Sequence, residues 1–380
     1  MIIELRGLQF VNKGAELMLQ AILQELKNSG IEYQLAMKHN SNCPAHKVEN
    51  IGAIKKVMLQ KNRLNLNFLT YYIPSVLRNY LIQKKGIVLE ADVDVVLDGS
   101  GFAYGDQWGS MHIRQVCSEL LRFASHDKKF IFLPQALGPF TRQADIKALK
   151  KALPKASLIC AREANSYNNI SELNSNKSNL RQFPDFTNLV SGDLPDYFRN
   201  GEDKFVIIPN NKMLSGQNSN TEWNRTYIQK LVELGKLAKE AGLSVVVLNH
   251  EGVKDKELCL KIEDELGFSV EQIEEADPLK VKGIIGASKA LVCSRFHGCV
   301  SALCQGVPCI GTSWSFKYEQ LFREYGQEQF LLDSDMSSEE LSKLFMMAIQ
   351  RAPGVISPEA NGYKTKSKEM WREVLGLIRS

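Results

Sequence analysis

Short apolar runs alternate with longer amphipathic stretches along most of this chain. The short runs are rich in β-branched residues, which is typical of buried strands. The longer stretches repeat apolar residues at helical spacing, as Leu19, Ile22 and Leu26 do within 14–28. This alternation predicts βαβ units, and therefore an α/β fold built on parallel sheets.

The pattern places each expected element by its residue range. Strands are predicted at 2–5, 33–37, 93–97, 129–133, 157–160, 204–209, 243–248 and 290–293. Helices are predicted at 14–28, 108–124, 143–153, 162–167, 221–241, 254–266, 278–286, 316–325, 337–350 and 358–379.

The domain organisation follows from length and from one change of composition. A chain of 380 residues exceeds one ordinary core, so two domains are expected. The polar segment 169–202 resembles a linker, which divides the chain into Rossmann-like domains at 1–195 and 203–355. The remaining 356–380 would form a helix that could pack back on the first domain. Two doubly wound domains of this kind carry their active sites in the cleft between them, at the carboxyl ends of the strands.

Composition mainly excludes classes of partner. The net charge of +4 is too small to indicate nucleic-acid binding. No apolar run is long enough to span a membrane, and the start lacks the pattern of a signal peptide. The eight cysteines form no CxxC pair, so we expect a reducing cytoplasmic location, no metal site and no cofactor.

The strongest candidate for chemistry follows the predicted strand 290–293. Arg295 and His297 stand where this strand ends and an apolar helix begins. A helix start offers free N–H groups to an anion, and an arginine can bind phosphate or carboxylate through two hydrogen bonds. The pair therefore indicates an anion site with an acid–base group. The alternative is a structural histidine beside an arginine that pairs with a surface carboxylate.

Two glycine-containing turns of the first domain could also approach a ligand. Asn12 and Gly14 lie between the first strand and the first helix, where the alternative is an ordinary turn capped by the asparagine. A second turn follows the strand 93–97 and consists of Asp98, Gly99, Ser100 and Gly101, with Asp106 shortly after. In this second turn Asp98 could orient a sugar hydroxyl or cap the next element.

Three further polar residues lie at strand ends or helix starts. Gln135 opens the loop after the strand 129–133, and Arg162 follows the strand 157–160 in the same predicted sheet. Lys317 opens the helix predicted at 316–325. Each could contact a substrate, and the alternatives are an ion pair for Arg162 and a solvated side chain for Lys317.

The stretch 63–82 is apolar and aromatic with basic flanks. Such a stretch could contact a membrane surface, which would suit a lipid-linked substrate. Pro74 divides it, and a role in the core or in lining a cleft is the alternative.

Taken in order, these motifs resemble the polysaccharide pyruvyl transferase family. The resembling pieces are VNKGAE (11–16), VVLDGSGFAYGD (95–106), LPQALGPF (133–140), CARE with Ser166, FPDF (183–186) and SRFHGCVSALCQGVPCIG with Lys317. They cover nearly the whole chain, and the Ser-x-Arg-x-His-Gly element is the most specific of them.

The resemblance implies a GT-B-like fold and a pyruvyl transferase activity. The donor would be phosphoenolpyruvate, and the acceptor a sugar of a surface polysaccharide or of its lipid-linked precursor, on which two hydroxyls form a cyclic ketal. Arg295 and His297 would line the donor site, with Arg162 as a second anion clamp. Two alternatives stay open: a GT-B glycosyltransferase with a nucleotide-sugar donor, and a non-catalytic protein that binds acidic glycans.

Overall fold

The computed structural model describes residues 1–61, 64–216, 218 and 220–380, and only the backbone of Phe316. The chain divides into two compact units. The first consists of Met1–Val11, Met18–Phe186 and Lys366–Ser380, and the second of Asn12–Leu17 and Thr187–Thr365. Helices α1 (Lys13–Asn28) and α13 (Pro358–Arg379) therefore contribute residues to both units.

The first unit is built on a parallel sheet with the strand order β10-β9-β8-β7-β1-β2-β3-β6. The winding reverses between β1 and β7, and ligands of doubly wound folds bind at this kind of switch point. The strands are β1 (Ile2–Arg6), β2 (Gln34–Lys38), β3 (Ala53–Lys56), β6 (Ile87–Val88), β7 (Val95–Asp98), β8 (Lys129–Gln135), β9 (Leu158–Ala161) and β10 (Leu180–Gln182).

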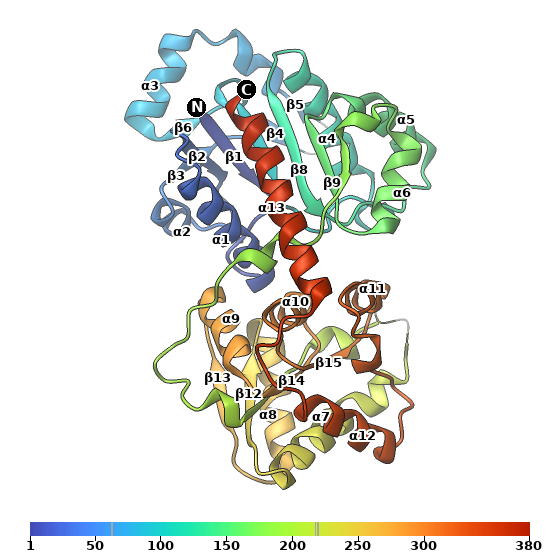
Figure 1. Cartoon of the computed structure of the whole chain (residues 1–380). Helices are drawn as coiled ribbons and strands as arrows, with labels where there is room; N and C mark the ends of the chain where they lie inside the picture. The colour runs from blue at the N-terminus through green and yellow to red at the C-terminus, as the bar shows by residue number, and fades with distance from the viewer. Residues whose placement is uncertain (62–63, 217, 219) are drawn as a thin grey trace. The chain divides into compact units, whose positions relative to one another are not determined.

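Amphipathic helices pack on this sheet (Figure 1). In α4, the buried residues Ile113, Val116, Leu120 and Phe123 recur at helical spacing, so one stripe of the helix enters the core. The helices of the unit besides α1 and α13 are α2 (Ala45–Asn50), α3 (Ser75–Lys85), α4 (Ser110–Ala124), α5 (Gln143–Ala152) and α6 (Ala164–Leu173). The two short strands β4 (Gln60–Lys61) and β5 (Leu64–Asn65) pair with each other in antiparallel orientation.

The second unit repeats the same architecture with the order β13-β12-β11-β14-β15-β16. Its strands also pair in parallel, and its switch point lies between β11 and β14. The strands are β11 (Lys204–Ile208), β12 (Ser244–Asn249), β13 (Glu271–Glu274), β14 (Ala290–Cys293), β15 (Cys309–Thr312) and β16 (Leu331–Leu332).

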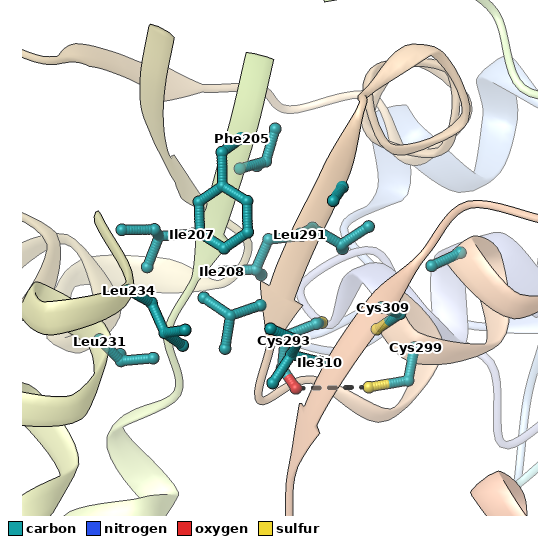
Figure 2. Close-up of a cluster of buried hydrophobic side chains, with 14 of the residues drawn as sticks. Phe205, Ile207, Ile208, Leu231, Leu234, Leu291, Cys293, Cys299, Cys309 and Ile310 are labelled. Carbon is teal, nitrogen blue, oxygen red and sulfur yellow. Dashed lines mark hydrogen bonds between the residues drawn. The ribbon is translucent and has the colours of Figure 1, made fainter. Parts of the chain in front are cut away.

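The central strands of the second unit are apolar on both faces because helices cover both sides of the sheet. Figure 2 shows Phe205, Ile207 and Ile208 of β11 beside Leu291 of β14, and all four are fully buried. The helices are α7 (Trp223–Glu240), α8 (Gly252–Leu266), α9 (Pro278–Ala287), α10 (Phe296–Gln305), α11 (Phe316–Glu324) and α12 (Ser338–Ile349).

The predicted α/β alternation is confirmed. The structure corrects the predicted loop at 169–202 and adds several short elements. The segment 169–202 is not wholly a loop, because α6 extends to Leu173 and β10 pairs in parallel with β9. The short elements α2, β3, β6, β13 and β16 were not predicted, since two to six residues carry too little periodicity.

Candidate functional site

The turn between β14 and α10 places Arg295 and His297 at the switch point of the second unit. The residues of β14 are fully buried, and Arg295 is the N-cap residue with an extended backbone (φ −109°, ψ 126°). His297 is the second residue of α10 and is half-buried. The strand end and the helix start thus hold both side chains on one short segment, as the sequence predicted.

Two carboxylates of the second unit hold the guanidinium of Arg295. Its Nε donates to Asp255 Oδ2 at 2.9 Å, its Nη2 also binds Asp255, and its Nη1 binds Glu251. The Asp255 side chain is 1% exposed and that of Glu251 is 23% exposed. Arg295 is therefore anchored by a buried partner on one edge and by a more accessible partner on another.

Burial raises the pKa of Asp255, and the charge of Arg295 opposes that shift. Asp255 Oδ1 also accepts a bond from the backbone N–H of Asn211 at 3.0 Å. These contacts explain why a carboxylate is tolerated inside the unit: both of its oxygens have partners.

A second histidine follows strand β12, which β11 separates from β14 in the sheet. His250 is 5% exposed, and its Nδ1 has no hydrogen-bond partner among the described residues. Burial, followed by the nearby charges of Arg295 and His297, lowers the pKa of His250 well below the ordinary value. His250 is therefore neutral at pH 7.

Ser294 is the centre of a buried hydrogen-bond network beside Arg295. Its hydroxyl accepts bonds from Tyr227 Oη at 2.6 Å and from Thr312 Oγ1 at 2.7 Å. Its carbonyl oxygen accepts bonds from Asn210 Nδ2 at 2.8 Å and from Tyr318 Oη at 2.9 Å. These bonds tie the carboxyl ends of β11, β14 and β15 together, so the segment that carries Arg295 and His297 is held firmly.

Lys317 lies near this network in the first turn of α11. Its ammonium is 4.7 Å from the ring centre of Trp314, 5.2 Å from that of Phe296 and 5.6 Å from that of Tyr318. Cations at such distances are attracted to aromatic faces. Phe296 lies between Arg295 and His297 in the sequence. The Lys317 ammonium is therefore close to the segment 295–297.

The turn after β7 belongs to the first unit and is internally bonded. Asp98 is completely buried, and its Oδ1 accepts bonds from the Ser100 N–H at 3.0 Å and from the Ser100 hydroxyl at 2.5 Å. Its Oδ2 accepts a bond from Tyr104 Oη at 2.6 Å. These are the contacts of the capping alternative, in which Asp98 shapes the turn. Burial raises the pKa of Asp98, against the charge of Arg6.

The two glycines of this turn serve different purposes. Gly101 adopts φ +68°, a conformation that favours glycine. Gly99 has no positive φ, but a Cβ there would lie 2.9 Å from Leu8 Cδ2. Glycine permits positive φ at both positions, and only Gly101 adopts it.

Three other candidates of the first unit lie at or after the ends of strands: Gln135 ends β8, Arg162 follows β9 and Asp106 follows β7. Gln135 is fully buried at the end of β8 and donates to the carbonyl of Asp98 at 3.2 Å. Arg162 is 8% exposed and lies 3.4 Å from Asp185 Oδ2, so its ion pair is buried and not the surface pair considered from the sequence. Asp106 accepts a bond from the Thr141 N–H at 2.8 Å.

Asn12 caps the first helix, since its Oδ1 accepts a bond from the Ala15 N–H at 3.0 Å. Gly14 lies in the first turn of the same helix. Both residues are grouped with the second unit.

The sequence model of the polysaccharide pyruvyl transferase family matches residues 12–315, which is most of the chain. This chain belongs to that family. The matched range includes Asn12, Arg162, Arg295 and His297, and Lys317 lies two residues beyond its end. The predicted resemblance is thereby confirmed, and with it membership of a transferase family.

Solved structures with the same fold include two UDP-N-acetylglucosamine 2-epimerases. UDP-GlcNAc 2-epimerase from Methanocaldococcus jannaschii superposes with a TM-score of 0.61 at 11% identity, covering 98% of this chain and 99% of that chain. UDP-N-acetylglucosamine 2-epimerase from Rickettsia bellii gives 0.53 at 12% identity, covering 100% and 96%. These likenesses show the GT-B type of fold alone. A search of the curated proteins finds no match.

Neither a metal-ligand cluster nor a membrane-spanning helix is found in the described part of this pyruvyl transferase family member. Among the described residues, no group of three or more His, Cys, Asp or Glu side chains could hold a metal ion. Within the same residues, no helix is long and apolar enough to cross a membrane.

The sequence reasoning missed the partners of Arg295, although a signal for them exists. His250 and Glu251 come two and three residues after the apolar strand 243–248, and the rule that strand ends carry ligand groups would have selected them. Asp255 stands four residues after Glu251, one helical turn away, and faces the same arginine. The contacts of Ser294 with Tyr227 and Thr312 join residues far apart in the sequence, and no local pattern indicates them.

Proposed function

We propose that this protein transfers a pyruvyl group from phosphoenolpyruvate to two hydroxyls of a sugar, forming a cyclic ketal. One observation carries the proposal: within a chain of this family, Arg295 and His297 share the helix start at the switch point of the second unit. The donor carries a phosphate and a carboxylate, so it needs cationic and N–H donors. A helix start with an arginine and a lysine nearby supplies both kinds.

In this proposal His297 is the general acid–base. Its protonated ring gives a proton to C3 of the enol, which makes C2 electrophilic, and the first sugar hydroxyl attacks C2. The ring then takes the proton of that hydroxyl and returns to its starting state. The second hydroxyl attacks C2 as phosphate leaves with the remaining proton, so one donor and one diol give one ketal and one phosphate.

Arg295 and Lys317 are the proposed anion-binding groups. The bonds to Glu251 and Asp255 use three of the five N–H groups of the guanidinium. These two carboxylates compensate the positive charge of Arg295. We propose that an anionic group of the donor displaces the Glu251 carboxylate from the guanidinium. Lys317, held over the ring of Phe296, would neutralise the departing phosphate.

The test is turnover with a defined donor. Purified protein is incubated with a polysaccharide or lipid-linked acceptor and either phosphoenolpyruvate or a nucleotide sugar. We expect phosphate release only with phosphoenolpyruvate, and a product heavier than the acceptor by one pyruvate less one water. Transfer from the nucleotide sugar would instead support the glycosyltransferase alternative, and binding without turnover would support the glycan-binding alternative.

The role of His297 is tested in the same assay. His297→Ala should lower kcat by about 10²–10⁴, the usual contribution of a general acid–base group. His112→Ala is the matched control, because His112 is an exposed histidine on α4 of the other unit. Near wild-type turnover of His297→Ala would contradict the assignment.

A further inference from the structure

The first unit carries an exposed apolar surface on η1 (Asn67–Tyr72) and α3. Phe68, Leu69, Tyr72, Val76, Leu77 and Tyr80 form this surface, which we call the η1–α3 surface. Tyr72 is 82% exposed and Val76 is 80% exposed. No residue of α3 is buried. Soluble proteins rarely leave this many large apolar side chains together in water, so the surface calls for a partner.

The fold holds this surface in place through its polar residues. Asn67 is buried and accepts a bond from the Leu59 N–H at 2.8 Å. Thr70 is also buried, and its hydroxyl donates to the Asn67 carbonyl at 2.6 Å and accepts from the Ala91 N–H at 3.2 Å. In η1, polar residues thus point inward while Phe68 and its apolar neighbours face water.

Helix α3 likewise turns a charged residue toward the protein and apolar residues toward water. Arg78 forms an ion pair with Asp92 at 3.0 Å, and Ile82, one turn later, packs against the core of the unit. Val76, Leu77 and Tyr80 lie on the opposite side of the helix and are 80%, 52% and 52% exposed. The helix is therefore attached by one face and presents an apolar stripe on the other.

Basic side chains flank the stripe, and acidic ones are missing from this part of the sequence. Lys84 and Lys85 are exposed in the last turn of α3. No aspartate or glutamate occurs between Glu49 and Glu90. In Figure 1, α3 lies at the margin of the first unit beside β6, the last strand of its sheet.

We propose that the η1–α3 surface docks on an anionic lipid bilayer. An apolar stripe that includes tyrosines and has lysines beside it is the pattern by which helices bind in the plane of a membrane interface. Lipid headgroups of negative charge attract exposed lysines, and the segment 50–89 itself carries no acidic residue that would oppose this attraction. A protein partner or a second copy of this chain would not need that one-sided charge. The proposal is independent of the reaction at Arg295 and His297.

The test is flotation of the full-length protein with lipid vesicles. We expect binding to vesicles of phosphatidylglycerol and phosphatidylcholine, and much weaker binding to phosphatidylcholine alone. The double variant Val76→Asp with Leu77→Asp should lower binding by about 10-fold or more, because it removes two apolar side chains from the contact. Lys84→Gln with Lys85→Gln should lower binding to the anionic vesicles by about 10-fold and reduce its dependence on salt.

Each variant has a matched control. Lys150→Gln with Lys151→Gln changes two exposed lysines on α5 of the same unit, and should bind as the wild type does. Leu260→Asp with Val355→Asp changes two apolar side chains of the second unit that are 53% and 64% exposed, with the same expectation. All changed residues of these pairs are exposed, and circular dichroism checks that each variant is folded.

Three results would overturn the proposal. One is the absence of wild-type binding to anionic vesicles. Another is equal loss of binding in a control pair and in its matched variant. The third is a wild-type dimer in size-exclusion chromatography that Val76→Asp with Leu77→Asp converts to a monomer without a change in vesicle binding, which would assign the surface to a second copy. Phosphate release from phosphoenolpyruvate is measured separately, so failure here leaves the proposed reaction untouched.

Discussion

Glu251 binds Nη1 of Arg295 through its carboxylate, while Asp255 holds the other edge of the same guanidinium. The two carboxylates differ in accessibility, because the Glu251 side chain is 23% exposed and that of Asp255 is 1% exposed. A ligand anion could replace the accessible one and not the buried one. This difference makes Glu251 a competitor for the donor and Asp255 a fixed support.

The first prediction is that Glu251→Gln strengthens donor binding. The change removes a negative charge that competes for Arg295, and a partly exposed ion pair contributes up to about 1 kcal/mol. The dissociation constant for phosphoenolpyruvate should therefore fall by up to about 5-fold, measured by isothermal titration calorimetry. Glu257→Gln, an exposed change on the same helix, should leave it unaltered. Weaker binding by Glu251→Gln would show that Glu251 supports the donor site.

The second prediction separates the same two carboxylates by stability. Asp255→Ala should lower the free energy of unfolding by about 3 kcal/mol, because it leaves the Arg295 charge without its buried partner. Glu251→Ala should cost less than about 1 kcal/mol. Urea denaturation measures both, with the exposed Asp264→Ala as the control. Equal losses for the two substitutions would contradict the difference in their roles.

The third prediction concerns pH and His250. Its pKa is lowered in the folded state, first by burial and then by Arg295, so the unfolded chain binds a proton that the folded chain does not. The unfolded histidine titrates near pH 6.5, so stability should fall as the pH drops below that value. The expected slope from this residue is at most about 1.4 kcal/mol per pH unit.

Comparison of two variants isolates that contribution. His250→Gln should show a shallower loss of stability between pH 7 and pH 5 than the wild type, as measured by urea denaturation at each pH. His112→Gln, at an exposed position, should keep the wild-type slope. An unchanged slope in His250→Gln would mean that His250 titrates alike in the folded and unfolded states.

The central strands and the Arg295–His297 turn could be predicted from the sequence because their signals are local. The apolar residues of β14 are contiguous, and the polar pair follows within four residues. The family motifs, taken in order along the chain, indicated the turns after the other strands. The outer strands β6 and β16 have only two residues each, so their pairing depends on the sheet beside them.

The contacts of Ser294, beside Arg295, could not be predicted, because they join three strand ends. Asn210 follows β11, Ser294 follows β14 and Thr312 ends β15. A βα repeat specifies that these ends meet at one edge, but which side chain contacts which depends on packing. In the first unit the sequence left two roles open for Asp98, and only the bonds to Ser100 and Tyr104 distinguish them.

The fourth prediction follows from those bonds. Tyr104→Phe removes the hydroxyl that donates to Asp98 Oδ2 and leaves a buried carboxylate oxygen without a partner. The free energy of unfolding should fall by about 1–3 kcal/mol, the cost of an unsatisfied buried acceptor. Tyr80→Phe, at a tyrosine that is 52% exposed, should stay within about 0.5 kcal/mol of the wild type in the same urea titration. Because the substitution acts on the turn and not on the acid–base group, folded Tyr104→Phe protein should keep the pH profile of wild-type turnover. A stable Tyr104→Phe variant with a shifted profile would instead place Asp98 in the chemistry.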